Sequence, residues 1–130
     1  MKNVAAALFI KNNSVLIAQR AEKTNQGGLW EFPGGKQEPH ETLFECLERE
    51  IKEEFCVSCK ATQIFCESIY TYVHGTIKLV AIFAELADEP IKLMVHTDYQ
   101  WVKIKDLVSY QLAPADMPIA KKLIEVYGNT

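Results

Sequence analysis

Residues 42–55 combine a helix start signal with helical periodicity, and they commit the middle of this chain to an amphipathic helix. Thr42 and Glu45 have the T-x-x-E spacing of a capping box. At about 100° per residue, the apolar side chains of the segment fall on one face, which contains Leu43, Phe44, Leu47, Ile51 and Phe55. A helix of this kind must bury its apolar face against another layer of structure.

Segments rich in β-forming residues lie on both sides of this helix. Two hairpins are predicted, one from residues 4–10 and 14–20 around an Asn-rich turn, and one from residues 62–73 and 76–86 around His74-Gly75. The order of elements predicts a single α+β domain over residues 1–130, with helices packed on a mixed sheet. Its other expected parts are strands at 29–33 and 99–104, a loop at 36–40, a helical turn at 105–110 and a C-terminal helix at 115–126.

The composition narrows the class of partner. The chain has 130 residues and a formal net charge of −3, which argues against a surface that coats polymeric nucleic acid. A polyphosphate substrate remains compatible with this charge if metal ions bridge the like charges. No apolar run approaches the ~20 residues that a membrane span needs. We expect a cytoplasmic protein with no membrane association, present as a monomer or homodimer.

The four cysteines include a C-x-x-C at Cys56 and Cys59. A zinc site would need a second ligand pair at matching spacing, and the sequence has none. We expect free thiols in a reducing compartment.

Three glutamates of the predicted helix share a sector beside its apolar face. Glu50, Glu53 and Glu54 lie there, whereas Glu41, Glu45, Glu48 and Lys52 fall on the opposite, solvated side. Like charges at these spacings repel, and a position near the core adds a desolvation cost. A hard cation such as Mg²⁺ would resolve the conflict. An acidic surface helix with incidental clustering explains the same pattern.

The loop before the helix contains Pro33-Gly34-Gly35-Lys36. Paired glycines let the backbone approach a ligand closely, and lysine suits a phosphate. An ordinary turn with a surface lysine is the alternative for this loop taken alone.

Loop and helix together resemble the Nudix box, G-x5-E-x7-R-E-U-x-E-E-x-G-U, where U is aliphatic. Every position matches except Cys56, where the family usually has glycine at the helix end. The matching residues are Gly35, Glu41, Arg49, Glu50, Ile51, Glu53, Glu54 and Val57. Residues 29–36 and 113–118 also resemble MutT-like members of this family, so the likeness spans most of the chain.

The resemblance implies a Nudix-type α/β/α sandwich with a mixed β-sheet. It also implies hydrolysis of a nucleoside triphosphate to a monophosphate and pyrophosphate, with 8-oxo-dGTP or a cytosine triphosphate as candidate substrates. Two alternatives stay open: action on a nucleotide sugar or dinucleotide, and a non-catalytic nucleotide-binding module. Loss of box glutamates would favour the non-catalytic module, and none is lost here.

The family's metal site carries over to the box residues. Glu50, Glu53 and Glu54 would bind Mg²⁺, with Mn²⁺ as the alternative, helped by the carbonyl of Gly34 or Gly35. Arg49 would orient Glu41 or Glu50; an ion pair with Glu45 is its ordinary alternative. Either a box glutamate or Asp98, in the loop before the last strand, would serve as the general base.

The substrate contacts implied by the resemblance are less specific. Lys36 and Arg20 would bind phosphates. Asp116 would accept a hydrogen bond from the nucleobase, and the alternative is an N-cap of the last helix, a position that favours Asp. Phe32 would line the base pocket, although an aromatic residue in a strand is more often part of the core.

Overall fold

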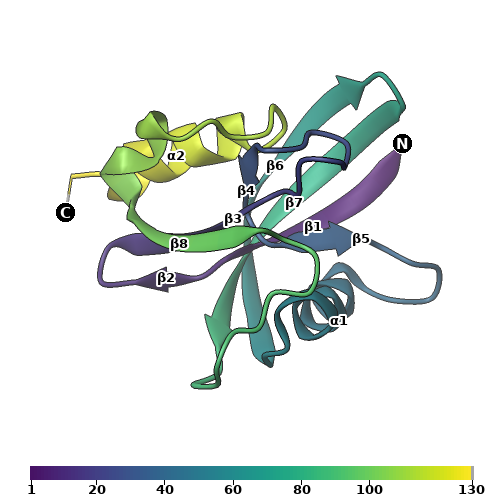
Figure 1. Cartoon of the computed structure of the whole chain (residues 1–130), viewed down its shortest axis with the longest axis horizontal. Helices are drawn as coiled ribbons and strands as arrows, with labels where there is room; N and C mark the ends of the chain where they lie inside the picture. The colour runs from purple at the N-terminus through teal and green to yellow at the C-terminus, as the bar shows by residue number, and fades with distance from the viewer. Residues whose placement is uncertain (130) are drawn as a thin grey trace.

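The computed structural model describes residues 1–129, whose strands form two four-stranded sheets (Figure 1). The first sheet is mixed: β1 pairs in parallel with β7, and its other pairs are antiparallel. In the order across the sheet, its strands are β5 (Gly34–Lys36), β1 (Lys2–Leu8), β7 (Gly75–Leu86) and β6 (Cys59–Tyr72).

The second sheet is antiparallel and is built around β3 (Ser14–Gln19). Three strands pair with it: β2 (Ile10–Lys11), β4 (Trp30–Glu31) and β8 (Asp98–Lys103).

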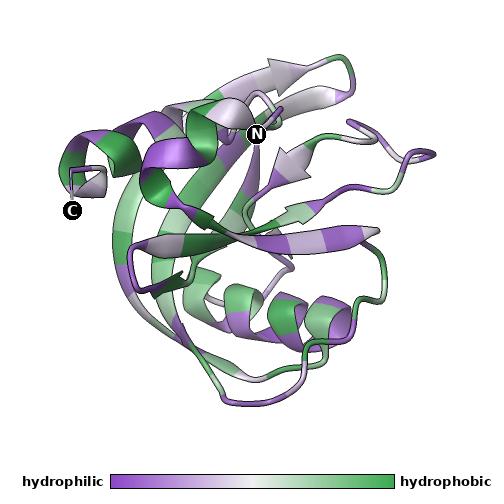
Figure 2. Cartoon of the chain, turned by 60° about the vertical axis from the view of Figure 1, so that its left-hand side comes forward, coloured by the Kyte–Doolittle hydropathy of each residue, from purple (hydrophilic) through white to green (hydrophobic). Residues whose placement is uncertain are grey.

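Two α-helices cover the strands from opposite sides, α1 (Leu43–Phe55) and α2 (Met117–Tyr127) (Figure 1). A 3-10 turn, η1 (Ile104–Ser109), follows β8 and packs against α2. Hydrophobic and hydrophilic residues alternate along both α-helices, as expected for elements that each bury one side (Figure 2). The predicted α+β sandwich with helices on a mixed sheet is confirmed. No helix in residues 1–129 is long and apolar enough to cross a membrane.

The central strands bury both faces, which explains their uninterrupted apolar sequences. In β1, Ala5 and Ala7 pack in one core cluster with α1, whereas Ala6 and Leu8 pack in a second cluster that includes residues of α2. The same alternation divides β3 and β7 between the two clusters. The strands therefore form a shared layer between the helices.

The boundaries of α1 follow the predicted capping box. The Thr42 hydroxyl accepts from Glu45 N, and the Glu45 carboxylate accepts from Thr42 N at 2.9 Å. At the other end, Cys56 takes a left-handed conformation with φ 57°. The last carbonyls of the helix accept from the segment before β8, where Met94 N donates to Glu54 O at 3.0 Å.

The first predicted hairpin was largely wrong. Of the predicted first strand, residues 4–10, only Ile10 pairs with β3, and it does so together with Lys11 as the short strand β2. Strand β1 instead runs between β5 and β7 in the other sheet, because an apolar run buried on both faces suits a central strand. The predicted Asn-rich turn is confirmed, with positive φ at both Asn12 and Asn13.

The loop expected at 36–40 begins later than predicted, because residues 34–36 form strand β5. This strand pairs with β1, placing Gly34 opposite Ala6 and Gly35 opposite Ala5. A Cβ atom on Gly34 would collide with the carbonyl oxygen of Ala5, so glycine permits the close pairing. The second hairpin, the last strand, the helical turn and the C-terminal helix are confirmed with small boundary shifts, and all four cysteines are free thiols.

Candidate active site

A cavity of about 440 Å³ opens where the two sheets, α1 and the loops around them meet, within the size range of small-molecule sites. One end is acidic and carries box residues, and the other carries aromatic and aliphatic side chains of β6 and β7. Its lining includes Arg20, Glu31, Phe32, Gly34, Gly35, Lys36, Glu50, Glu54, Tyr72, His74, His96 and Asp116.

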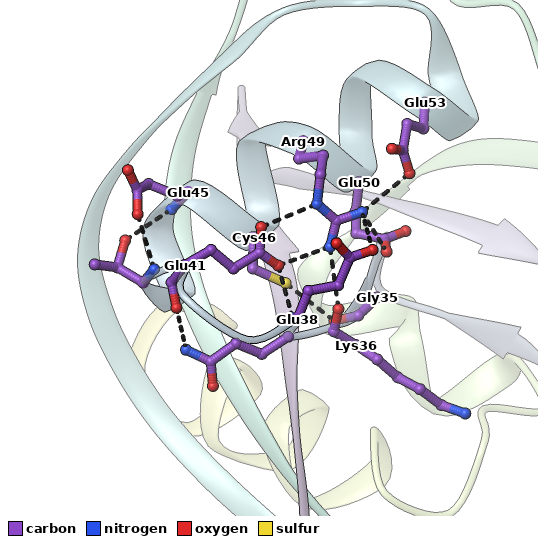
Figure 3. Close-up of polar contacts among 11 residues, drawn as sticks. Gly35, Lys36, Glu38, Glu41, Glu45, Cys46, Arg49, Glu50 and Glu53 are labelled. Carbon is purple, nitrogen blue, oxygen red and sulfur yellow. Dashed lines mark hydrogen bonds and ion pairs between the residues drawn. The ribbon is translucent and has the colours of Figure 1, made fainter.

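Next to the acidic end of the cavity, Arg49 bonds several box carboxylates at once (Figure 3). Its guanidinium donates to Glu41 at 2.7 and 3.0 Å, to Glu50 at 3.1 Å and to Glu53 at 3.0 Å. It also donates to the carbonyl of Lys36 at 3.2 Å, which ties α1 to the end of β5. The Arg49 bond lowers the pKa of Glu41 to about 2. Arg49 therefore holds several box carboxylates in fixed positions.

Arg49 thus contacts both partners that the sequence offered, Glu41 and Glu50. Glu45, the alternative partner, is engaged in the capping box with Thr42. Glu41 was expected on the solvated face of the helix. It instead precedes the helix, and its carboxylate accepts from Arg49.

Glu50 and Glu54 line the cavity side by side on α1. Burial raises the pKa of Glu50. Burial, followed by the neighbouring Glu50 charge, raises the pKa of Glu54 to about 7. The protein therefore maintains two adjacent, partly desolvated carboxylates that resist ionisation together, a pattern common at functional sites.

A divalent cation fits this arrangement. Gly35 lies so close to Glu50 that an added Cβ atom would collide with the carboxylate, so glycine at this position leaves room for the Glu50 side chain. Within residues 1–129, no three acidic, histidine or cysteine side chains converge enough to hold a metal by themselves. Mg²⁺ is usually held by one or two carboxylates together with water and substrate phosphates. Glu50 and Glu54 match that requirement.

Two predicted residues lie away from the cavity lining. The Glu53 side chain is 58% exposed and bonds Arg49. Asp98 begins β8, where its carboxylate accepts from its neighbours Tyr99 N at 2.8 Å and Gln100 Nε2 at 3.3 Å. The structure brings Glu50 and Glu54 together but leaves Glu53 and Asp98 outside that pair.

Arg20 lies in the cavity wall, but its charge is already paired. It donates to the Glu31 carboxylate at 3.1 Å and to the carbonyl of Asn25 at 2.6 Å. Glu31 also contacts Nε2 of His96 at 2.9 Å. Sequence reasoning missed both Glu31 and His96. A carboxylate between Trp30 and Phe32 in an apolar strand was a usable signal for Glu31; His96 had none.

Asp116 is buried in the cavity wall and occupies the N-cap position of α2 as the sequence suggested, but its side chain makes no capping hydrogen bond there. Its Oδ2 accepts instead from Phe32 N at 2.9 Å. Burial, followed by the charge of Glu31, raises the pKa of Asp116 well above its ordinary value. Of the two roles that the sequence left open, the side-chain N-cap is therefore wrong.

Phe32 belongs to the core and also contributes to the cavity wall, and its contact with a nucleobase stays a prediction. Lys36 is exposed at the mouth of the cavity, and its side chain extends away from the Arg49 cluster (Figure 3). Tyr72 and His74 stack at 5.6 Å and form an aromatic wall on the hairpin of β6 and β7. The cavity therefore has an anionic end suited to a cation and an aromatic end suited to a ring.

Comparisons with known proteins identify the family of this chain. A family model described as the NUDIX domain matches residues 4–122. The chain is 31% identical over 119 residues to the CTP pyrophosphohydrolase of Escherichia coli (strain K12), covering 92% of this chain and 88% of that protein. It is 44% identical over 70 residues to the 8-oxo-dGTP diphosphatase of Proteus vulgaris, covering 54% of this chain and 59% of that protein.

Solved structures agree on the fold. The solution structure of the E. coli ORF135 protein has a TM-score of 0.84 and 30% identity, covering 97% of this chain and 90% of that chain. The crystal structure of MutT protein from Methanosarcina mazei Go1 has a TM-score of 0.86 at 21% identity, covering 96% of this chain and 94% of that chain. These matches show that the chain, whose box residues Gly35, Glu50 and Glu54 line the cavity, belongs to the Nudix hydrolase family, as a MutT-like member.

Proposed function

We propose that this protein is a Mg²⁺-dependent pyrophosphohydrolase that converts a nucleoside triphosphate to a nucleoside monophosphate and pyrophosphate. One observation carries the proposal: Glu50 and Glu54 form a partly buried carboxylate pair at one end of a cavity that has Asp116 and an aromatic wall elsewhere. The phosphate chain would bind beside a cation held by the carboxylate pair, and the nucleobase would bind near Asp116 and the aromatic wall.

The residues at the acidic end would divide the work. When bound, the metal supplies charge neutralisation of the phosphates and lowers the pKa of water. Glu50 and Glu54 would hold it, with a carbonyl of Gly34 or Gly35. Arg49 orients Glu50, and the exposed ammonium group of Lys36 at the cavity mouth would bind the phosphate chain. Mn²⁺ would substitute for Mg²⁺, because both accept oxygen ligands.

General-base catalysis is assigned to a box glutamate in this proposal. Glu54 lies in the cavity and would accept the proton of water through a carboxylate oxygen that does not bind the metal. Asp98 is the weaker candidate, because its carboxylate is turned toward Tyr99 and Gln100.

Asp116 is proposed to contact the nucleobase. Its Oδ2 is fixed by Phe32 N, so the carboxyl group has a set orientation in the cavity wall. The raised pKa favours the protonated form, which donates one hydrogen bond and still accepts others. Cytosine and oxidised guanine triphosphates are the candidate substrates, in line with the names of the relatives with CTP and 8-oxo-dGTP activity.

A pyrophosphate-release screen tests the function. Purified protein with Mg²⁺ is supplied in turn with the common ribo- and deoxynucleoside triphosphates, 8-oxo-dGTP, nucleotide sugars and dinucleotides. We expect monophosphate and pyrophosphate from a cytosine triphosphate or 8-oxo-dGTP, and loss of both products in Glu54→Gln. Turnover only of nucleotide sugars or dinucleotides would contradict the substrate class. No turnover on any member would leave the alternative of a binding module.

A further inference from the structure

His96 occupies an unusual position in the cavity wall. Its side chain is 4% exposed, and its ring stacks on Phe55 with centroids 5.1 Å apart. Nε2 lies 2.9 Å from a carboxylate oxygen of Glu31, whereas Nδ1 is buried without a hydrogen-bond partner among the described residues. An unsatisfied buried nitrogen has a free-energy cost. Stability alone would be better served by an apolar ring at this position.

The backbone on both sides of His96 is anchored. Met94 N donates to Glu54 O on α1 at 3.0 Å, and Thr97 N donates to Gln19 O on β3 at 3.0 Å. The imidazole is therefore held between the helix that carries the box glutamates and the second sheet. This fixation places Nε2 against Glu31, a residue 65 positions earlier in the chain.

Glu31 has two fixed neighbours and remaining acceptor capacity. One carboxylate oxygen accepts from Arg20 Nη1 at 3.1 Å, and the other lies 2.9 Å from His96 Nε2 and 3.4 Å from the same Arg20 nitrogen. An ionised carboxylate has about four lone-pair sites, so the cavity-lining group can accept further hydrogen bonds. Its negative charge would repel a phosphate, whereas an N–H or O–H group of a nucleoside would be accepted.

We infer that His96 is a positioning residue for nucleoside recognition: its imidazole holds the Glu31 carboxylate in the cavity wall, where that carboxylate accepts from an N–H or O–H group of the nucleoside. The inference rests on the proposed nucleotide hydrolase function and adds a recognition element to it. His96 itself acts through Glu31, with Arg20 fixing the opposite oxygen.

Two substitutions separate positioning from packing. His96→Phe retains a ring against Phe55 and removes both nitrogens, so the melting temperature should stay equal or rise. His96→Gln retains an N–H donor for Glu31. His40→Gln is the matched control, because His40 is an exposed histidine outside the cavity lining.

We expect His96→Phe to raise KM for the preferred triphosphate roughly tenfold, as for loss of a charged hydrogen bond, with kcat nearly unchanged. His96→Gln should restore most of the KM. Glu31→Gln should raise KM similarly, and the double variant should add little, since both changes remove one interaction. An unchanged KM in His96→Phe, equal impairment of kcat in both His96 variants, or additive effects would each overturn the inference.

A binding measurement keeps this test separate from the proposed reaction. The dissociation constant of α,β-methylene-CTP and of its dGTP counterpart is measured with Mg²⁺ by tryptophan fluorescence. If wild-type protein binds an analogue but hydrolyses no nucleotide, the proposed reaction fails, and roughly tenfold weaker binding by His96→Phe still supports the inference. Equal binding by His96→Phe and wild type, or no binding of either analogue by wild type, would overturn it.

Discussion

At Glu54, the needs of catalysis and of folding oppose each other. Burial and the adjacent Glu50 raise its pKa to about 7 from an ordinary 4.5, so the native state holds this proton more tightly than the unfolded chain. The stability of the metal-free protein should therefore fall as pH rises across that interval. Above about pH 7, the native protein bears the full free-energy cost of ionising Glu54 beside Glu50.

Glu54→Gln should accordingly stabilise the metal-free protein while lowering kcat by at least about 10³-fold, because a metal ligand and its charge are lost. The gain in melting temperature over wild type should be larger at about pH 8 than at about pH 5. Glu53→Gln is the comparison. Its exposed carboxylate contacts Arg49, so we expect a smaller loss of activity, of about 10- to 100-fold. Equal kcat losses in the two variants would contradict this ranking of the ligands.

Asp116 permits a separate test of base recognition. Asp116→Asn retains an acceptor for Phe32 N and removes the ionisable group, whereas Asp116→Ala leaves that buried N–H without its partner. Because burial raises the pKa of Asp116, the stability advantage of Asp116→Asn over wild type should grow as pH rises above about 4. Asp116→Ala should lose about 1–3 kcal/mol. Melting curves over pH measure both effects.

Asp116→Asn also reports on selectivity among nucleobases. If Asp116 contacts the base, Asp116→Asn should change the ranking of kcat/KM among the common triphosphates and 8-oxo-dGTP while the protein stays folded. For triphosphates whose base does not contact Asp116, kcat/KM should change little. An unaltered ranking in Asp116→Asn would assign Asp116 only to holding Phe32.

Among the elements, the end of α1 is the place where this chain departs from the family pattern. Cys56 has φ 57°, a left-handed conformation that normally favours glycine. Cys56→Gly should therefore stabilise the protein by about 1 kcal/mol and leave kcat/KM unchanged. Cys56→Ala retains the backbone cost without the thiol and should melt near wild type. A clear fall in the melting temperature of Cys56→Gly would show that packing of the thiol outweighs the backbone cost.

Local signals made some elements predictable and left others hidden. The capping box of Thr42 and the 3.6-residue period are both contained in residues 42–55, so the start and the end of α1 could be predicted. Strand β5 could not, because Gly34 becomes a strand residue only through pairing with β1. His96 likewise gains its role from Glu31, which no local pattern connects to it. The acidic end of the cavity, contained largely in one loop and helix, was therefore more predictable than the rest of its lining.

For the molecule as a whole, a divalent metal should act as a stabilising ligand. If the cation binds the native state alone, stability rises with its free concentration, by ~2.7 kcal/mol at a hundred times the dissociation constant. We expect the melting temperature to rise with Mg²⁺ or Mn²⁺, to return to its original value with chelator, and to rise much less in Glu54→Gln. Potassium chloride at matched ionic strength is the control. A shift of the same size in Glu54→Gln would place the stabilising ion elsewhere.

Strand β1 contributes neighbouring residues to both core clusters, Ala5 and Ala7 to one and Ala6 and Leu8 to the other. Neither side can open without disturbing the strand that it shares with the other side. The amide protons of β1 and its parallel partner β7 should therefore exchange with solvent deuterium only through complete opening of the domain. The loop carrying Arg20 and Asn25 lies outside this layer, so we expect its amides to exchange through local opening while the layer beneath it stays closed.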